Sequence, residues 1–283
     1  MDEAAWRAGS QRAKVGAVEL AYRVDGDAGS PVLLVMGLAM PGRAWQFQVE
    51  ELAQSHRVMT FDNRGVGDSE RAAGPYTMAM MAQDALGLLD AAGWSDAHVV
   101  GVSMGGMIAQ EIALRGRNRV RSLTLIATHA GGLGAVLPHR QGLLQFVRAQ
   151  VGDREQRGRA LAQLLFPPGF LASCDRAWLH RTLTSDLGNP PPLATRRAQV
   201  GAVLTHRTAD RLERLAGLPT LLVRPDLDTL VRPTQTDRLH RLLPHARLLR
   251  VPDAGHGLIR QVPQLLNREL LRHFADADGA RAA

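Results

Sequence analysis

Ser103 is the residue of this sequence whose setting best suits a nucleophile, because it lies in the motif Gly-Val-Ser-Met-Gly at residues 101–105. The apolar run 97–100 predicts a short buried strand before it, and residues 104–114 predict an apolar helix after it. A strand that runs directly into a helix needs a tight turn, and the two glycines remove side chains that would collide there. The pattern predicts a serine hydroxyl at the carboxyl edge of a sheet; the alternative is a serine that caps a buried helix.

A serine hydroxyl needs a general base within hydrogen-bond reach, and His256 fits that role best. It lies in the segment Asp-Ala-Gly-His-Gly at residues 253–257, directly after the last predicted strand. Because parallel strands end at one edge of a sheet, we expect His256 beside Ser103. His129 follows a core strand and is expected to line the pocket. Five other histidines lie in charged helical or turn segments, where solvent is expected to reach them: His56, His180, His240, His245 and His273.

Two aspartates in the loop of residues 224–231 could orient the imidazole of the base. Asp228 lies deeper in this loop and is followed by apolar residues that can anchor it. Asp226 is suited to capping the turn, or to an ion pair with Arg224 or Arg232. We therefore favour Asp228 as the acid and keep Asp226 as the alternative. The order along the chain is then nucleophile, acid, base.

An acyl-transfer site also needs two N–H groups that stabilise the negative oxygen of the tetrahedral intermediate, each worth about 3–4 kcal/mol of the barrier. Met104 is one expected donor, since it follows the serine at the start of a helix. Leu38 is the other, because it lies in the glycine-containing loop 37–42 after the predicted strand 31–36.

Strands alternate with helices through most of the chain, which predicts an α/β fold with a doubly wound, mostly parallel sheet. The alternation of strands and helices stops at residues 129–215, which contain amphipathic segments and no convincing strand. This predicts a helical cap, residues 129–215, inserted into a core of residues 1–128 and 216–283. The tail, residues 275–283, is small and charged and is expected to be disordered. The expected strands are 15–24, 31–36, 57–61, 97–100, 120–127, 219–223 and 246–251, and the expected helices are 45–54, 78–92, 104–114, 143–151, 157–166, 174–187, 195–208, 233–243 and 258–274.

Composition argues against several function classes. The chain of 283 residues has a formal charge of +7, but its arginines are scattered and its aromatic residues make up 4%, so no nucleic-acid partner is expected. Cys174 is the single cysteine, which excludes an intrachain disulfide. No signal peptide or membrane span is evident, which favours the cytoplasm. The expected partner is a small-molecule substrate without cofactor or metal, and identical subunits are possible.

The chain resembles the α/β-hydrolase superfamily with a helical cap, most closely its esterase, lactonase and cofactor-free haloperoxidase-like branches. The resemblance implies Ser103 as nucleophile, Asp228 as acid and His256 as base. It also implies that Leu38 and Met104 supply the oxyanion N–H groups. The matching segments are residues 36–38, 61–69, 101–105, 226–231 and 254–256.

The expected substrate is a small to medium apolar ester or lactone, cleaved through an acyl-enzyme intermediate. Methionines at positions 36, 40, 104 and 107 suggest an adaptable apolar site around the serine. A carbon–carbon bond hydrolase or thioesterase would use the same triad, and a slow-turnover ligand-binding protein is the alternative from another class. The expected pocket residues are Met40, Trp45, Met107, His129, Phe146 and Trp178.

Overall fold

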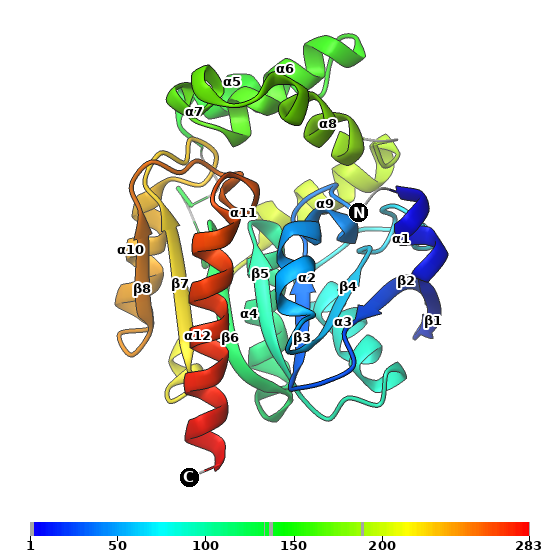
Figure 1. Cartoon of the computed structure of the whole chain (residues 1–283), viewed down its shortest axis with the longest axis vertical. Helices are drawn as coiled ribbons and strands as arrows, with labels where there is room; N and C mark the ends of the chain where they lie inside the picture. The colour runs from blue at the N-terminus through cyan, green and yellow to red at the C-terminus, as the bar shows by residue number, and fades with distance from the viewer. Residues whose placement is uncertain (1–2, 133, 136–137, 188–189, 283) are drawn as a thin grey trace.

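An eight-stranded sheet in the order β1-β2-β4-β3-β5-β6-β7-β8 forms the centre of the computed structural model, which describes residues 3–132, 134–135, 138–187 and 190–282 (Figure 1). The β1–β2 and β2–β4 pairs are antiparallel and all other pairs are parallel. This confirms the predicted doubly wound, mostly parallel sheet. The strands are β1 (Gln11–Val15), β2 (Val18–Asp25), β3 (Pro31–Val35), β4 (Arg57–Phe61), β5 (Ala97–Val102), β6 (Val120–Ile126), β7 (Thr220–Pro225) and β8 (Arg247–Val251).

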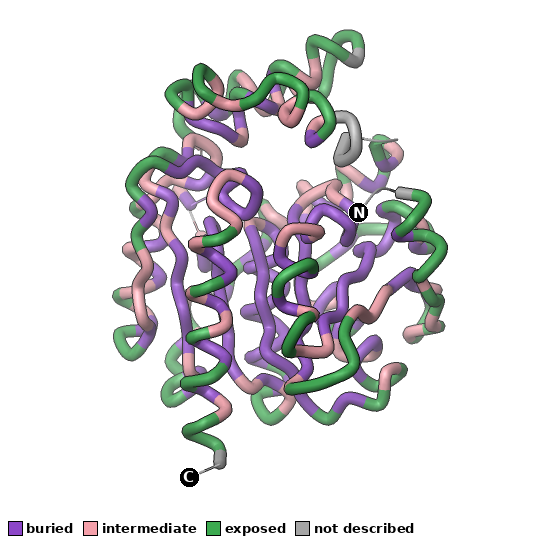
Figure 2. The backbone as a smooth tube through the Cα atoms, viewed as in Figure 1, coloured by how far each residue is buried: buried purple, intermediate pink, exposed green. Residues whose placement is uncertain are grey.

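Helices cover both faces of the sheet, because the central strands are apolar on both sides. In β3, Leu33 packs into one hydrophobic core and the adjacent Leu34 into the other, as the alternation of a strand requires. Figure 2 shows the resulting buried strands between exposed helix faces. One face carries α3 (Met78–Ala91), α4 (Met104–Arg115) and α10 (Pro233–Leu242), and the other α2 (Gln46–Leu52), α11 (Leu258–Gln261) and α12 (Pro263–Ala282).

A helical insertion lies between β6 and β7 and covers the carboxyl edge of the sheet (Figure 1). Its two ends are joined by a β-bridge between Gly131 and Arg207 and by a 3.0 Å hydrogen bond from Thr208 N–H to Ala130 C=O. These contacts close the neck of the cap. Its helices are α5 (Arg140–Arg148), α6 (Arg154–Leu165), α7 (Pro168–Ser173), α8 (Arg176–Leu187) and α9 (Leu193–Thr205), and the remaining short helices of the chain are α1 (Glu3–Gly9), η1 (Gly42–Trp45), η2 (Arg117–Arg119) and η3 (Leu212–Leu215).

The prediction of a disordered tail is wrong, because α12 continues to Ala282. Its last turns are held against the sheet: Ala277 is buried, Asp278 forms a 2.7 Å ion pair with Arg121, and Arg281 pairs with Asp96 at 2.9 Å. Within the described residues, no helix is long and apolar enough to cross a membrane.

Four histidines are buried in the core, and burial, which penalises the charged ring, lowers the pKa of each. The pKa of His129 falls to about 3, and those of His98, His206 and His273 fall to about 4. The prediction that His273 is solvated is wrong: its side chain is buried in the middle of α12. The folded protein therefore holds all four rings neutral at pH values where the unfolded chain protonates them.

We expect stability to fall steeply as the pH drops from about 6.5 to about 4. In this window the unfolded state binds protons that the folded state does not, so each buried ring lowers the unfolding free energy by up to about 1.4 kcal/mol per pH unit. Burial raises the pKa of Asp62 to about 6, so this group stabilises the folded state as the pH falls. Its effect is smaller than the combined effect of the four histidines. Urea unfolding between pH 8 and pH 4 measures the slope. His98→Gln should flatten it and the exposed His139→Gln should not; equal stability at pH 7 and pH 5 would contradict the prediction.

Candidate active site

Ser103 lies in the sharp turn that joins β5 to α4, with φ 56° and ψ −122°. The glycines of the motif are required by close packing. A Cβ on Gly101 would lie 2.3 Å from the carbonyl oxygen of Gly105, and a Cβ on Gly105 would lie 2.1 Å from that of Val35. The strand, the turn and the helix can therefore approach one another only with glycine at these positions. The packing forces Ser103 into a backbone conformation that residues with a side chain rarely adopt.

Backbone strain gathers at this edge of the sheet. Among the described non-glycine residues, positive φ angles occur at Ala39 (61°), Ser103 and Ala127 (48°). They follow β3, β5 and β6, three neighbouring parallel strands. Each such residue costs about 1–3 kcal/mol and persists only where the surrounding structure imposes it. Clustered strain of this kind is typical of functional sites.

His256 is held by a buried carboxylate. Its Nδ1 lies 2.7 Å from Oδ2 of Asp228, whose side chain is fully buried. The other oxygen of Asp228, Oδ1, accepts hydrogen bonds from the N–H groups of Leu230 (2.8 Å) and Val231 (2.9 Å). An N–H at Nδ1 that donates to Asp228 leaves Nε2 as the acceptor of the ring.

Of the two candidate aspartates, the structure brings Asp228 to the imidazole and places Asp226 elsewhere. Asp226 pairs with Arg224 at 3.0 Å and with Arg250 at 2.9 Å. The ion pair with Arg224 is the structural role considered for it from the sequence.

The cap fixes the loop that carries His256. The N–H of Gly257 donates to the carbonyl oxygen of Leu165, at the end of α6, over 2.8 Å. A Cβ on Gly255 would lie 2.7 Å from the same oxygen. The glycines around the histidine therefore let the cap close directly onto this loop, which links the position of the imidazole to the insertion.

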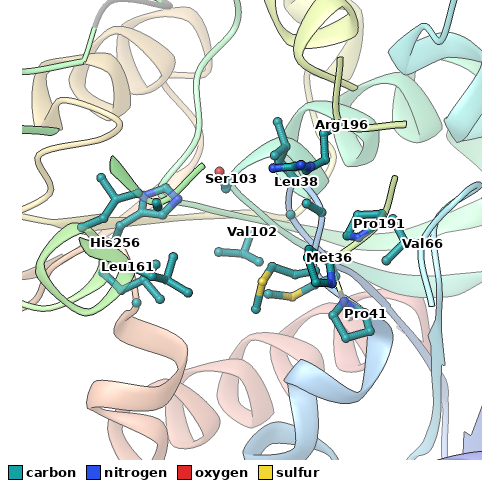
Figure 3. Close-up of a pocket in the computed structure, with 18 of the residues that line it drawn as sticks. Met36, Leu38, Pro41, Val66, Val102, Ser103, Leu161, Pro191, Arg196 and His256 are labelled. Atoms are coloured by element: carbon teal, nitrogen blue, oxygen red, sulfur yellow. The ribbon is translucent and has the colours of Figure 1, made fainter. Parts of the chain in front are cut away.

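Ser103 and His256 line one cavity of about 220 Å³ beneath the cap (Figure 3). Of the pocket residues expected from the sequence, Met40 and Phe146 line it. Its walls are mostly apolar, and the side chains that line it include Met36, Leu38, Val102, Leu161, Leu164 and Ile259.

The other four expected pocket residues lie outside the cavity wall, which corrects the prediction. Trp45 is fully buried in the core under α2, and Met107 faces the core from α4. His129 is turned inward, where its Nδ1 accepts the N–H of Gly131 at 3.0 Å. Trp178 packs in the cap at 5.7 Å from the ring of Phe170. Apolar spacing identified these side chains as buried but could not tell which packing layer each one enters.

The two expected oxyanion donors flank the serine. Leu38 lines the cavity, and a Cβ on the preceding Gly37 would lie 3.3 Å from Cβ of Ser103. Met104 is the first residue of α4, where the N–H groups of a helix point outward. Among the described residues, neither N–H has a hydrogen-bond acceptor. Their role as oxyanion donors stays a prediction.

The loop that carries Leu38 is held from both the core and the cap. Nδ2 of Asn63 donates to the carbonyl oxygen of Met36 at 3.1 Å, and Asp62 accepts the N–H of Gly42 at 2.7 Å. From the cap, Oε1 of Gln199 in α9 accepts the N–H of Ala39 at 2.8 Å. Gln199 could not be predicted, because a contact between positions 39 and 199 depends on how the insertion folds back.

Arginines form the part of the cavity wall that sequence reasoning missed. The scatter of arginines along the chain suggested a compositional feature, yet the fold gathers some of them here. Those that line the cavity are Arg7, Arg43, Arg196 and Arg260. In the part of the chain that the structure describes, no group of three metal-ligating side chains occurs.

Comparison with known proteins agrees with this architecture. A family model described as alpha/beta hydrolase fold matches residues 30–259. The chain is 33% identical over 268 residues to RutD of Azorhizobium caulinodans, a candidate carbamate hydrolase, covering 93% of this chain and 97% of that protein. A thermophilic esterase from Thermogutta terrifontis superposes with a TM-score of 0.80 at 25% identity, covering 95% and 98% of the two chains. Est816, described as an N-acyl homoserine lactone degrading enzyme, superposes with a TM-score of 0.79 at 26% identity, covering 93% and 100%.

Proposed function

The chain belongs to the alpha/beta hydrolase fold family and is a hydrolase, and from that premise we propose that it is a serine hydrolase that cleaves a carboxylic ester or lactone through an acyl-enzyme. The observation that carries the proposal is the arrangement around one cavity. Ser103 lines it from a strained turn. His256 also lines it, and Nδ1 of its ring is hydrogen-bonded to the buried Asp228. Nucleophile, base and acid roles follow from that order of contacts.

The first half of the reaction acylates Ser103. Oγ attacks the carbonyl carbon while Nε2 of His256 accepts its proton, and the N–H groups of Leu38 and Met104 stabilise the oxyanion. The carbon–oxygen bond to the leaving alcohol then breaks, and the imidazolium returns the proton to that alcohol. Asp228 stabilises the imidazolium between the two steps. In the second half, His256 takes a proton from water, which attacks the acyl carbon. The bond from that carbon to Oγ of Ser103 then breaks, the imidazolium returns the proton to Oγ, and the acid leaves.

Several features support an ester or lactone with a substantial apolar part. The walls around the serine are methionine, leucine, valine and isoleucine side chains, which adapt to apolar groups of different shape. The names of the relatives include an esterase and a lactone-degrading enzyme, and also a candidate carbamate hydrolase. A carbon–carbon bond hydrolase or thioesterase would need the same triad. A substrate panel of enol-ketones, thioesters and simple esters separates these reactions.

A fluorophosphonate probe tests the proposal directly. We expect the folded wild type to gain the mass of one phosphonyl group, and peptide mapping to place it on Ser103, because an activated serine attacks the phosphorus. Ser103→Ala is the matched control and should stay unmodified. A wild type that hydrolyses no ester of a p-nitrophenyl chain-length series and forms no adduct would instead indicate a ligand-binding protein on the same scaffold.

A further inference from the structure

The cavity beside Ser103 has a strong excess of positive charge. Among the described residues that line it, four are arginines and none is an aspartate or glutamate. Arg7 is paired with Asp68 at 2.9 Å, at the rim. Arg260 donates to the carbonyl oxygen of Ala44 at 3.1 Å and lies over the ring of Phe47. Arg7 and Arg260 are therefore each engaged by groups of the protein itself.

Arg196 differs from the others in its contacts. It lies in the first turn of α9 and donates through Nη1 to the side-chain oxygen of Gln150, a neutral group. Its Nε is buried without a hydrogen-bond partner, and no described carboxylate lies within ion-pair distance. A guanidinium has five donors, and a charged group that loses water without an anionic partner is unfavourable.

The position of Arg196 in its helix adds to this imbalance. Helix N-termini carry partial positive charge and favour acidic side chains, yet the first turn of α9 has none and carries Arg196 as its fourth residue. One turn further along, Gln199 fixes the oxyanion loop. The same helix therefore brings a cation to the cavity wall while it holds the loop of Leu38. An anion bound there would be stabilised by the guanidinium.

We propose that Arg196 forms a carboxylate-binding subsite, so that the ester or lactone carries an acidic group at the end of its acyl part. This inference rests on the proposed function. In the view of Figure 3, Arg196 and His256 lie on opposite sides of Ser103. Because His256 protonates the leaving alcohol, that alcohol lies on the same side of Ser103 as His256. The acyl chain then extends the other way, toward Arg196. The apolar walls take the middle of the chain, and the guanidinium takes its charged end in bidentate contact.

A pair of p-nitrophenyl esters tests the subsite: the half-ester of adipic acid, with a free carboxylate, and the same ester with that carboxylate methylated. We expect wild type to favour the charged ester in kcat/KM, and Arg196→Gln to lower the ratio of charged to neutral by about 10–100-fold, the effect of a lost charge-assisted contact. Arg197→Gln, an exposed neighbour in the same helix, is the matched control and should keep the wild-type ratio. Thermal unfolding checks that both variants fold.

The outcomes separate the two proposals. Equal kcat/KM for both esters, with no change in the ratio in Arg196→Gln, would overturn the subsite and leave the hydrolase intact. If wild type hydrolyses neither ester, the proposed function fails, and calorimetry with monomethyl adipate on Ser103→Ala still tests the subsite. If Ser103→Ala with Arg196→Gln binds monomethyl adipate more weakly than Ser103→Ala alone, the subsite is supported. If the two proteins bind it equally, or if Ser103→Ala binds dimethyl adipate equally well, the subsite is overturned.

Discussion

Replacing Ser103 by alanine is expected to lower kcat for ester hydrolysis by about 10⁴–10⁶-fold, the loss that follows removal of a serine nucleophile. The reason is geometric: the imidazole of His256 would then face a methyl group with no proton to give. Residual activity should come from the N–H groups of Leu38 and Met104 acting on bound substrate with water as the nucleophile. Initial rates with p-nitrophenyl esters at high enzyme concentration measure the difference.

The stability of variants at Ser103 provides the control for the loss of activity. Ser103→Ala keeps a Cβ at φ 56°, so its unfolding free energy should stay within about 1 kcal/mol of wild type. Ser103→Gly removes that Cβ and should be more stable by up to about 1–2 kcal/mol, since the strain is relieved. Urea unfolding measures both. A Ser103→Ala protein that is folded and keeps more than a tenth of the wild-type rate would show that another group is the nucleophile.

The positions of Ser103 and His256 at one edge of the sheet were predictable because both depend on local rules. The strand, the Gly-x-Ser-x-Gly turn and the helix around Ser103 follow from apolar runs and glycine spacing, and the structure gives β5 and α4 at that place. The parallel order of β5, β6, β7 and β8 then brings the loops after them to one edge of the sheet. No side-chain contact needs to be known for that step.

The parts that could not be predicted depend on contacts between distant segments. The tail is helical because Asp278 finds Arg121, a partner 157 positions away, and nothing in its small, charged composition signals that pairing. Gln199 and Arg196 reach the site because α9, the last helix of the cap, folds back toward the carboxyl edge of the sheet. The wrong pocket predictions have the same cause. Apolar spacing shows that Trp45 and Met107 are buried, but it does not show which elements they pack against.

Asp228→Asn is expected to lower kcat by about 10⁴-fold, with ring and backbone positions kept. The two N–H groups of Leu230 and Val231 donate to Oδ1, so the amide oxygen of an asparagine must take that place. Its NH₂ then points at Nδ1 of His256, and a donor there requires Nδ1 to be the acceptor. The ring proton moves to Nε2, so the nitrogen proposed as the general base can no longer accept the serine's proton. The variant thus has a base in the wrong tautomer, and steady-state kinetics at pH 7–8 measures the loss.

Asp226→Asn is the matched control, two residues away in the same loop and of the same chemistry. Its carboxylate pairs with Arg224 and Arg250 while His256 is paired with Asp228, so kcat should stay within about threefold of wild type. A severe loss in Asp226→Asn with a mild one in Asp228→Asn would move the acid role to Asp226. Two mild effects would mean that the imidazole keeps its working tautomer without a carboxylate, and the triad would reduce to Ser103 and His256. The ring tautomer in the variant is therefore set by the oxygen that the N–H groups of residues 230 and 231 hold, a contact that an asparagine preserves and an alanine does not.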